Sequence, residues 1–327
     1  MSSSTAEHVV PAPPLLSRSR RRRLDGDRVF IGLATAAGLG LFVIAGAFLV
    51  TLIIPAWPAV TRFGLGFLVG RVWNPVTSQF AALPFIYGTV LTSLIGLVIA
   101  IPIGLGAALV LAQPTRLTMI RGPLSFGIEL LAGIPSVVIG LWAFFILSPV
   151  MRNVVDPFLN HTLGFLPFFA GPPNGNSFLT AGIVLAIMVL PILVALSRDV
   201  IMAVPAELQE ASLALGATRA ETIWQVILPY ARVGITGAVL LALGRALGET
   251  IAVTMVIGNR PEITTHLFSA GYTLASVLAN EFTEAVGPLY QGALLELGLV
   301  LVLITITVNV LARLLVWSFR RSEPVAG

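Results

Sequence analysis

The sequence lacks cysteine and lysine altogether, and only 10% of its 327 residues are charged. Without cysteine the chain has no disulfide, no thiolate metal site and no cysteine nucleophile. Without lysine it lacks the side chain with which a P-loop reaches the β and γ phosphates of ATP. We therefore expect no catalytic residue in this chain, and any ATP-driven work must come from a partner that binds ATP and Mg²⁺.

Histidine is almost as scarce. His8, His161 and His266 are far apart and form no H-E-x-x-H or similar ligand pair. We interpret all three as loop or tail residues. The sequence thus predicts no metal site and no cofactor bound by this chain itself.

Apolar residues are what the sequence has in excess, at 57% with a mean hydropathy of +0.96. Soluble proteins have roughly 45–50% apolar and about 25% charged residues. A helix that crosses the hydrocarbon layer needs about 20 apolar residues. We therefore predict an all-α integral membrane protein with six transmembrane helices, near residues 29–54, 84–112, 123–148, 178–197, 232–257 and 290–317.

The arginines predict the orientation, because cytoplasmic loops accumulate positive charge. If the N-terminus is inside, fourteen arginines are cytoplasmic and four are outside, Arg62, Arg71, Arg152 and Arg260. Both termini are therefore predicted to be cytoplasmic. The long segments 55–83, 149–177 and 258–289 are predicted to lie outside.

The chain has one predicted membrane domain between two tails. Residues 1–27 combine Ser, Pro and an arginine run, which predicts a disordered basic cytoplasmic tail beside anionic lipid. A secretory signal is not favoured, because the following apolar run is long and shows no cleavage site, and a nucleic-acid role would need more than a tail. The membrane domain covers 28–321, with a cytoplasmic loop at 198–231, and 322–327 form a second tail.

That cytoplasmic loop contains VPAELQEASLALGATRAETIWQVILP at 204–229. Pro205 suits a first helical position, Glu207 lies in the positive first turn, and Gly216 is placed where a left-handed cap ends a helix. Small residues leave the first helix with a narrow profile. A simple helical linker and an element that docks into a groove of another protein both fit this pattern.

A second short helix is predicted directly after the glycine. Thr218 and Glu221 form a T-x-x-E capping box, and the helix is expected to run to Pro229 at the start of the next span. The loop is therefore predicted to be a helix, a glycine corner and a helix.

The fifth predicted span places Arg245 and Glu249 four residues apart near its middle. A charge at the centre of a lipid-facing helix costs about 2.5–3.5 kcal/mol, so the pair should face protein or a wet pathway. The spacing predicts that both lie on one helix face. The pair either fixes helix packing or forms an oxyanion site, in which the guanidinium donates two parallel hydrogen bonds and the glutamate neutralises it between cargo events.

Two further acids lie within predicted spans. Glu129, near the start of the third span, fits a structural cap or pair better than a pathway residue. Glu296, in the sixth span, either faces the pathway or bonds a neighbouring helix. Both remain candidate pathway residues.

The loop resembles a known signature. Glu210-Ala211-Ser212, Gly216 and the ending Val226-Ile227-Leu228-Pro229 are similar to the E-A-A-x3-G-x9-I-x-L-P motif of ABC importer membrane subunits. Ser212 and Val226 depart from the motif with residues of similar size. The resemblance implies a coupling helix that docks on an ATP-binding subunit, with Glu210, Ala211 and Gly216 as docking residues.

The membrane segments resemble one branch of that family, the PstC-type permeases of phosphate importers. G-R-A-L-G-E-T at 244–250 carries the resemblance, together with the stretches 82–112, 129–145 and 271–285. It implies a type I ABC importer permease that moves phosphate inward by alternating access, in the plasma membrane of a prokaryote. Arg245, Glu249 and Thr250 are then the pathway residues.

The resemblance also implies partners. These are a second homologous permease, a dimer of ATP-binding subunits, an extracytoplasmic phosphate-binding protein and membrane lipid. The Pro- and Gly-rich external segment 165–177 is either a capping loop or part of the docking surface for that binding protein. A permease for sulfate or molybdate, an ion-coupled secondary transporter and a membrane scaffold remain the alternatives.

Overall fold

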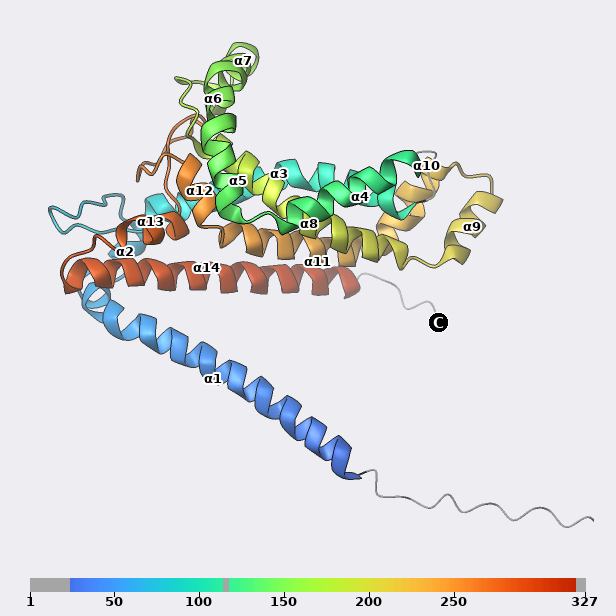
Figure 1. Cartoon of the computed structure of the whole chain (residues 1–327), viewed down its shortest axis with the longest axis horizontal. Helices are drawn as coiled ribbons and strands as arrows, with labels where there is room; N and C mark the ends of the chain where they lie inside the picture. Colours follow the sequence, from blue (N-terminus) through green and yellow to red (C-terminus); the bar gives the residue numbers. More distant parts are fainter. Residues whose placement is uncertain (1–23, 114–117, 322–327) are drawn as a thin grey trace, which may run out of the picture. The chain divides into compact units, whose positions relative to one another are not determined.

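The computed structural model describes residues 24–113 and 118–321, and these are mostly helical (Figure 1). The chain divides into two units, one ending at Val50 and the other starting at Thr51. Six helices are long and apolar enough to cross a membrane: Gly26–Phe63, Leu83–Ala112, Ser136–Leu163, Phe178–Met202, Arg219–Leu247 and Pro288–Leu311. The predictions of an all-α fold and of six spans are confirmed.

The first unit's described part is the N-terminal portion of α1 (Leu24–Phe63). The second unit contains the rest of α1 and every later element. In chain order these are α2 (Gly66–Val69), α3 (Leu83–Ala112), α4 (Thr118–Gly133), α5 (Ser136–Trp142), η1 (Ala143–Leu147), α6 (Ser148–Val150), η2 (Met151–Val155), α7 (Asp156–Leu163), η3 (Pro167–Phe169), α8 (Phe178–Met202), α9 (Ala206–Ala214), α10 (Arg219–Thr222), η4 (Ile223–Ile227), α11 (Leu228–Leu247), α12 (Ile251–Val256), α13 (Leu274–Glu281) and α14 (Pro288–Arg321).

Several helices are longer than the spans predicted for them. Helix α1 continues through Pro55 and Pro58 to Phe63 instead of ending at residue 54, and α8 runs five residues past 197. Leu24–Asp27, expected in the tail, form the first turn of α1. The rest of the predicted N-terminal tail and the predicted tail 322–327 lie outside the described residues.

The third span differs most from its prediction. Instead of one helix over 123–148, α4 ends at Gly133, and a new helix begins at Ser136. Pro135 has no N–H and disfavours a helical conformation at the residue before it, which interrupts the helix here. The helix that follows continues to Leu163. His161, expected in a loop, therefore lies in α7.

The fifth span was also divided incorrectly. The second short helix of the loop does not stop at Pro229, because α10, η4 and α11 run on from Arg219 to Leu247. Helix α11 ends instead at its C-cap Gly248, and α12 starts at Ile251. The predicted single helix over 232–257 is therefore wrong, and it is broken beside Arg245.

Three π-helical segments explain how proline is accommodated inside these long helices. Segments η1, η2 and η4 are each followed after two residues by a proline: Pro149, Pro157 and Pro229. Proline lacks an N–H and its ring clashes with the carbonyl four residues earlier. The wider π turn moves that carbonyl away, so the helix continues.

Helix α8 is the centre of the second unit, where it packs against α3, α11 and α4. Glycines permit the closest approach. A Cβ on Gly182 of α8 would lie 2.4 Å from Ile95 of α3, and a Cβ on Gly96 would lie 3.0 Å from Leu185. The interface between α3 and α8 is therefore fixed by small residues, as is common between membrane helices.

An aromatic cluster holds the segment between α2 and α3 in place. Trp73 lies edge-on to Phe80 and Phe85, with ring centroids 4.9 Å apart in both pairs. Its Nε1 donates a hydrogen bond to Glu281 Oε2 at 2.8 Å, and Tyr290 OH donates to the same oxygen at 2.7 Å. One carboxylate of α13 thus connects this segment to α14.

Gly88 of α3 should be intolerant of a side chain. A Cβ there would lie 2.1 Å from the carbonyl oxygen of Tyr272, a backbone atom that cannot rotate away. We expect Gly88→Ala to destabilise the protein by about 1–3 kcal/mol through overpacking. Gly106→Ala on the same helix, where a Cβ meets open space, is the matched control. Equal thermal unfolding temperatures of the two purified variants would contradict this packing.

Candidate functional site

Arg245 lines a cavity of about 400 Å³ in the second unit. The cavity is bounded by α4, α5, α8 and α11 and by the non-helical residue Ile134. Two of its lining residues are charged, Arg245 and Glu129. The others are apolar: Ile128, Leu131, Ala132, Ile134, Ile139, Met188, Pro191, Ile192 and Ala195. A cation and an acid thus share one apolar cavity, within the size range of small-ligand sites.

The cavity lies beside two helix breaks. One break separates α4 from α5 and the other separates α11 from α12. Beyond the breaks α5 packs on α12, so closely that a Cβ on Gly140 would lie 2.9 Å from the Cα of Ala252. Non-helical backbone inside a membrane is tolerated where it is buried in protein or lines a wet cavity. Transporters commonly form substrate sites at such discontinuous helices.

Glu249 does not share a helix face with Arg245, so that prediction is wrong. Arg245 is in the last turn of α11, whereas Glu249 lies after the C-cap Gly248. Its Oε1 accepts a hydrogen bond from Ala252 N at 3.4 Å, so the carboxylate satisfies the start of α12. Thr250 is the N-cap of α12, and its hydroxyl donates to Gly248 O at 3.2 Å. Both residues therefore stabilise the break.

Glu129, and not Glu249, lines the cavity together with Arg245. It lies in the last turn of α4, and Ser125 Oγ, one turn earlier, donates a hydrogen bond to its Oε1 at 3.2 Å. The structure brings it to the same cavity as Arg245, although the two residues are far apart in sequence. The sequence signal for this site was Pro135, shortly after Glu129. This proline interrupts the helix, so that α4 ends at the cavity.

Glu296 is separate from this site. It is 7% exposed in α14, and its Oε2 has no hydrogen-bond partner in the described part of the chain. It is not among the residues that line the cavity with Arg245. The structure therefore does not bring Glu296 to the cavity that Arg245 and Glu129 line.

The predicted helix–glycine–helix corner is confirmed. Helix α9 starts after Pro205, which is the N-cap and not the first helical residue as predicted, and Glu207 lies in the first turn. Gly216 has φ +91°, where glycine is favoured. Its N–H bonds Leu213 O, and the N–H of the next residue bonds Ser212 O at 3.2 Å, as in a Schellman motif.

The second helix of the corner begins with the predicted capping box. Glu221 N bonds Thr218 Oγ1 at 3.3 Å, and Thr218 N bonds Glu221 Oε2 at 2.7 Å. The hydroxyls of Ser212 and Thr222 lie 3.0 Å apart and connect α9 to α10. The corner therefore holds its shape by local hydrogen bonds.

The outer surface of the corner is exposed to solvent. No residue of α9 is buried, and Glu210, Ala211 and Gly216 are all exposed. Leu215, beside the glycine, is 90% exposed, and Leu213 is 44% exposed. The corner therefore leaves the apolar side chains of Leu213 and Leu215 at the surface beside the small residues of α9.

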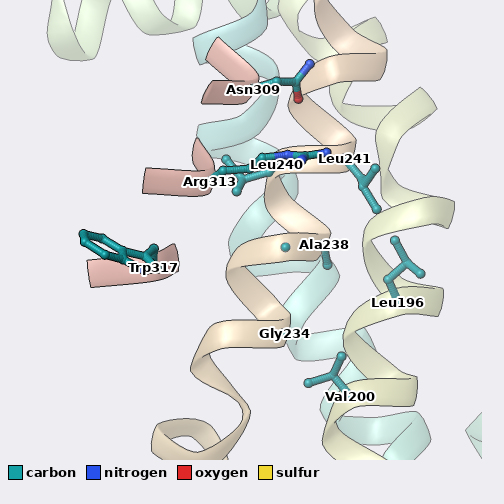
Figure 2. Close-up of a pocket in the computed structure, with 10 residues that line it drawn as sticks. Leu196, Val200, Gly234, Ala238, Leu240, Leu241, Asn309, Arg313 and Trp317 are labelled. Atoms are coloured by element: carbon teal, nitrogen blue, oxygen red, sulfur yellow. The ribbon is translucent and has the colours of Figure 1, made fainter. Parts of the chain in front are cut away.

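A larger cavity, of about 630 Å³, lies between α8, α11 and α14 (Figure 2). Its lining is mainly apolar, and Arg313 and Asn309 of α14 provide polar groups next to Leu240 and Leu241 of α11. None of the residues predicted as site residues lines it. Arg313 and Trp317 near the end of a spanning helix are typical of a membrane–water interface.

Known proteins match most of the chain. Residues 100–321 match the family described as binding-protein-dependent transport system inner membrane component. The phosphate transport system permease protein PstC of Mesorhizobium japonicum is 43% identical over 313 residues, which cover 93% of this chain and 95% of that protein. The protein of the same name from Xylella fastidiosa strain Temecula1 is 46% identical over 264 residues, covering 80% and 81%.

A solved structure agrees in fold. A chain of a bacterial alginate ABC transporter, crystallised with an alginate pentasaccharide-bound periplasmic protein, superposes with a TM-score of 0.55 at 16% identity. The match covers 89% of this chain and 96% of that chain. Taken together with the six spans and the helix–glycine–helix corner, these matches show that the chain belongs to the binding-protein-dependent inner-membrane permeases and, among them, to the PstC family.

Proposed function

We propose that this chain is one permease subunit of an ATP-driven importer that moves inorganic phosphate inward by alternating access. The observation that carries the proposal is the guanidinium of Arg245 in a cavity beside two broken helices. A guanidinium binds a tetrahedral oxyanion with two parallel hydrogen bonds. The names of the relatives from Mesorhizobium and Xylella support phosphate as the cargo.

Glu249 and Thr250 take part in this pathway by shaping it. Their hydrogen bonds at the start of α12 hold the interruption after Gly248. The interruption lets α11 end at the cavity with Arg245 in its last turn. Phosphate then passes the interruption between α11 and α12, where the guanidinium of Arg245 is the donor to the anion.

The α9–α10 corner links this chain to the subunits that bind ATP. In this proposal Glu210, Ala211 and Gly216 dock on one subunit of a separate dimer that binds ATP and Mg²⁺. The exposed, narrow surface of α9 and its internal hydrogen bonds support docking as a rigid unit. Closure of the ATP-binding dimer then moves α11 directly, because α10, η4 and α11 form one continuous helix.

This docking fixes the proposed orientation. The corner is cytoplasmic, so both termini are cytoplasmic in the plasma membrane of a prokaryote. The opposite ends of the spans, including 165–177, then face an extracytoplasmic phosphate-binding protein. Five of the six spans are less than a third buried, and among them 28%, 22% and 28% of the windows in Ser136–Leu163, Arg219–Leu247 and Pro288–Leu311 are covered. That leaves apolar surface for a second homologous permease and for lipid.

The test is transport by the complete assembly. The chain is co-purified with its partners, reconstituted in vesicles, and assayed for ATP-dependent uptake of radiolabelled phosphate. We expect uptake that requires ATP and that excess sulfate or molybdate does not reduce. Uptake that persists without the ATP-binding subunits would indicate a secondary transporter, and stronger competition by sulfate or molybdate than by unlabelled phosphate would assign another cargo.

A further inference from the structure

We propose that Glu129 selects the cargo by accepting a hydrogen bond from an O–H group of phosphate held by Arg245. This inference rests on the proposed function and adds a specificity-determining residue to it. It starts from the composition of the cavity, in which one carboxylate and one guanidinium are the charged groups of an otherwise apolar lining.

The carboxylate of Glu129 is held by one hydrogen bond within its own helix. Ser125 Oγ donates to Glu129 Oε1 at 3.2 Å, which restrains the side chain from within its own helix. An ionised carboxylate accepts hydrogen bonds at two oxygens with about four lone-pair sites. One bond from Ser125 therefore leaves most of the acceptor capacity for a ligand.

Glu129 and Arg245 line the same cavity without a direct ion pair in the described part of the chain. Both residues are exposed in the single chain, so neither side chain needs the other for neutralisation and both are accessible to a ligand. The cavity that both residues line has a volume of about 400 Å³, which is larger than one small anion requires. A ligand that satisfies both groups must present an acceptor to the guanidinium and a donor to the carboxylate.

Phosphate is an anion that meets both demands. Near neutral pH its ionised forms keep at least one O–H group beside their charged oxygens. Sulfate and molybdate are fully ionised there and present acceptors alone. A carboxylate therefore bonds phosphate and repels the other two, which is selection by an unfavourable contact with the competitor. A site built around a ligand hydroxyl rejects analogues that lack it much more strongly than a site built on size.

The binding protein also selects cargo, so the experiment must measure ligand binding in the cavity in the absence of that protein. The complete permease–ATPase complex is placed in lipid nanodiscs with no binding protein present. This chain has no cysteine, so Ala195→Cys places a single thiol in the cavity lining. Alkylation of that thiol by N-ethylmaleimide is followed by mass spectrometry of this chain, in the presence of inorganic phosphate or sulfate.

In the Ala195→Cys background we expect phosphate to slow alkylation at concentrations at least about tenfold below those at which sulfate does. Adding Glu129→Gln should bring the two concentrations within about threefold, because the amide carries no charge and can donate as well as accept. Glu129→Asp keeps the carboxylate and should keep the preference for phosphate. Glu284→Gln, an exposed acid far along the chain, is the control and should change nothing.

The outcomes separate this inference from the function itself. An undiminished preference for phosphate in Glu129→Gln overturns the inference, and so does a lack of protection by phosphate in the Ala195→Cys background. Neither result affects ATP-dependent phosphate uptake by the unmodified assembly, which decides the proposed function. If Glu129→Gln fails to assemble, loss of the preference in Glu129→Asp also counts against the inference.

Discussion

Replacing Arg245 by glutamine should reduce ATP-dependent phosphate uptake by about 100-fold or more while the complex still assembles. A hydrogen bond to a charged group contributes about 1.5–3 kcal/mol, and a bidentate guanidinium makes two of them to one oxyanion. Glutamine retains one amide donor group and loses the charge. Arg245 is exposed within the single chain, so little packing is lost. Initial uptake rates in vesicles, normalised to the amount of assembled complex, measure the effect.

Two further variants distinguish charge from geometry. Arg245→Lys keeps the charge but not the planar pair of donors, so it should give an intermediate rate. Arg260→Gln removes another exposed arginine, from a segment outside the predicted spans, and should leave uptake close to normal. Normal uptake by a well-assembled Arg245→Gln variant would exclude Arg245 from the pathway.

The parts of the fold that the sequence predicts well depend on local signals. The six spans follow from the length of their apolar runs, which no tertiary contact needs to explain. The corner around Gly216 follows from a glycine in a left-handed conformation and from the capping box of Thr218 and Glu221. These interactions join residues less than two helical turns apart, so the sequence contains all the information that they need.

The parts that the sequence does not predict depend on backbone interruption and packing. A hydropathy window averages over Pro135 and Gly248, and it therefore merges α4 with α5 and α11 with α12. If α11 and α12 are taken as one continuous helix, Arg245 and Glu249 are predicted to lie on the same helix face. The acid that shares the cavity with Arg245 is Glu129, and the packing of α4 against α8 brings it there, which no spacing in the sequence encodes.

Replacing Ala211 by arginine should abolish phosphate uptake by separating this chain from its ATP-binding partner. Ala211 is exposed on α9, where its small side chain leaves room for the surface of another protein. Arginine is a good helix former, so the helix itself should lose only a few tenths of a kcal/mol. A long charged side chain at the centre of an interface, in contrast, costs several kcal/mol, which is enough to release the partner.

Ala206→Arg is the matched control, because Ala206 is exposed on the same helix and lies about 140° around it from Ala211. The ATP-binding subunit that co-purifies with each variant is measured together with uptake. We expect Ala211→Arg to lose both and Ala206→Arg to keep both. Retention of the ATP-binding subunit and of transport by Ala211→Arg would show that the partner docks elsewhere. The continuous helix from α10 to α11 would then have no driving motion to transmit to Arg245.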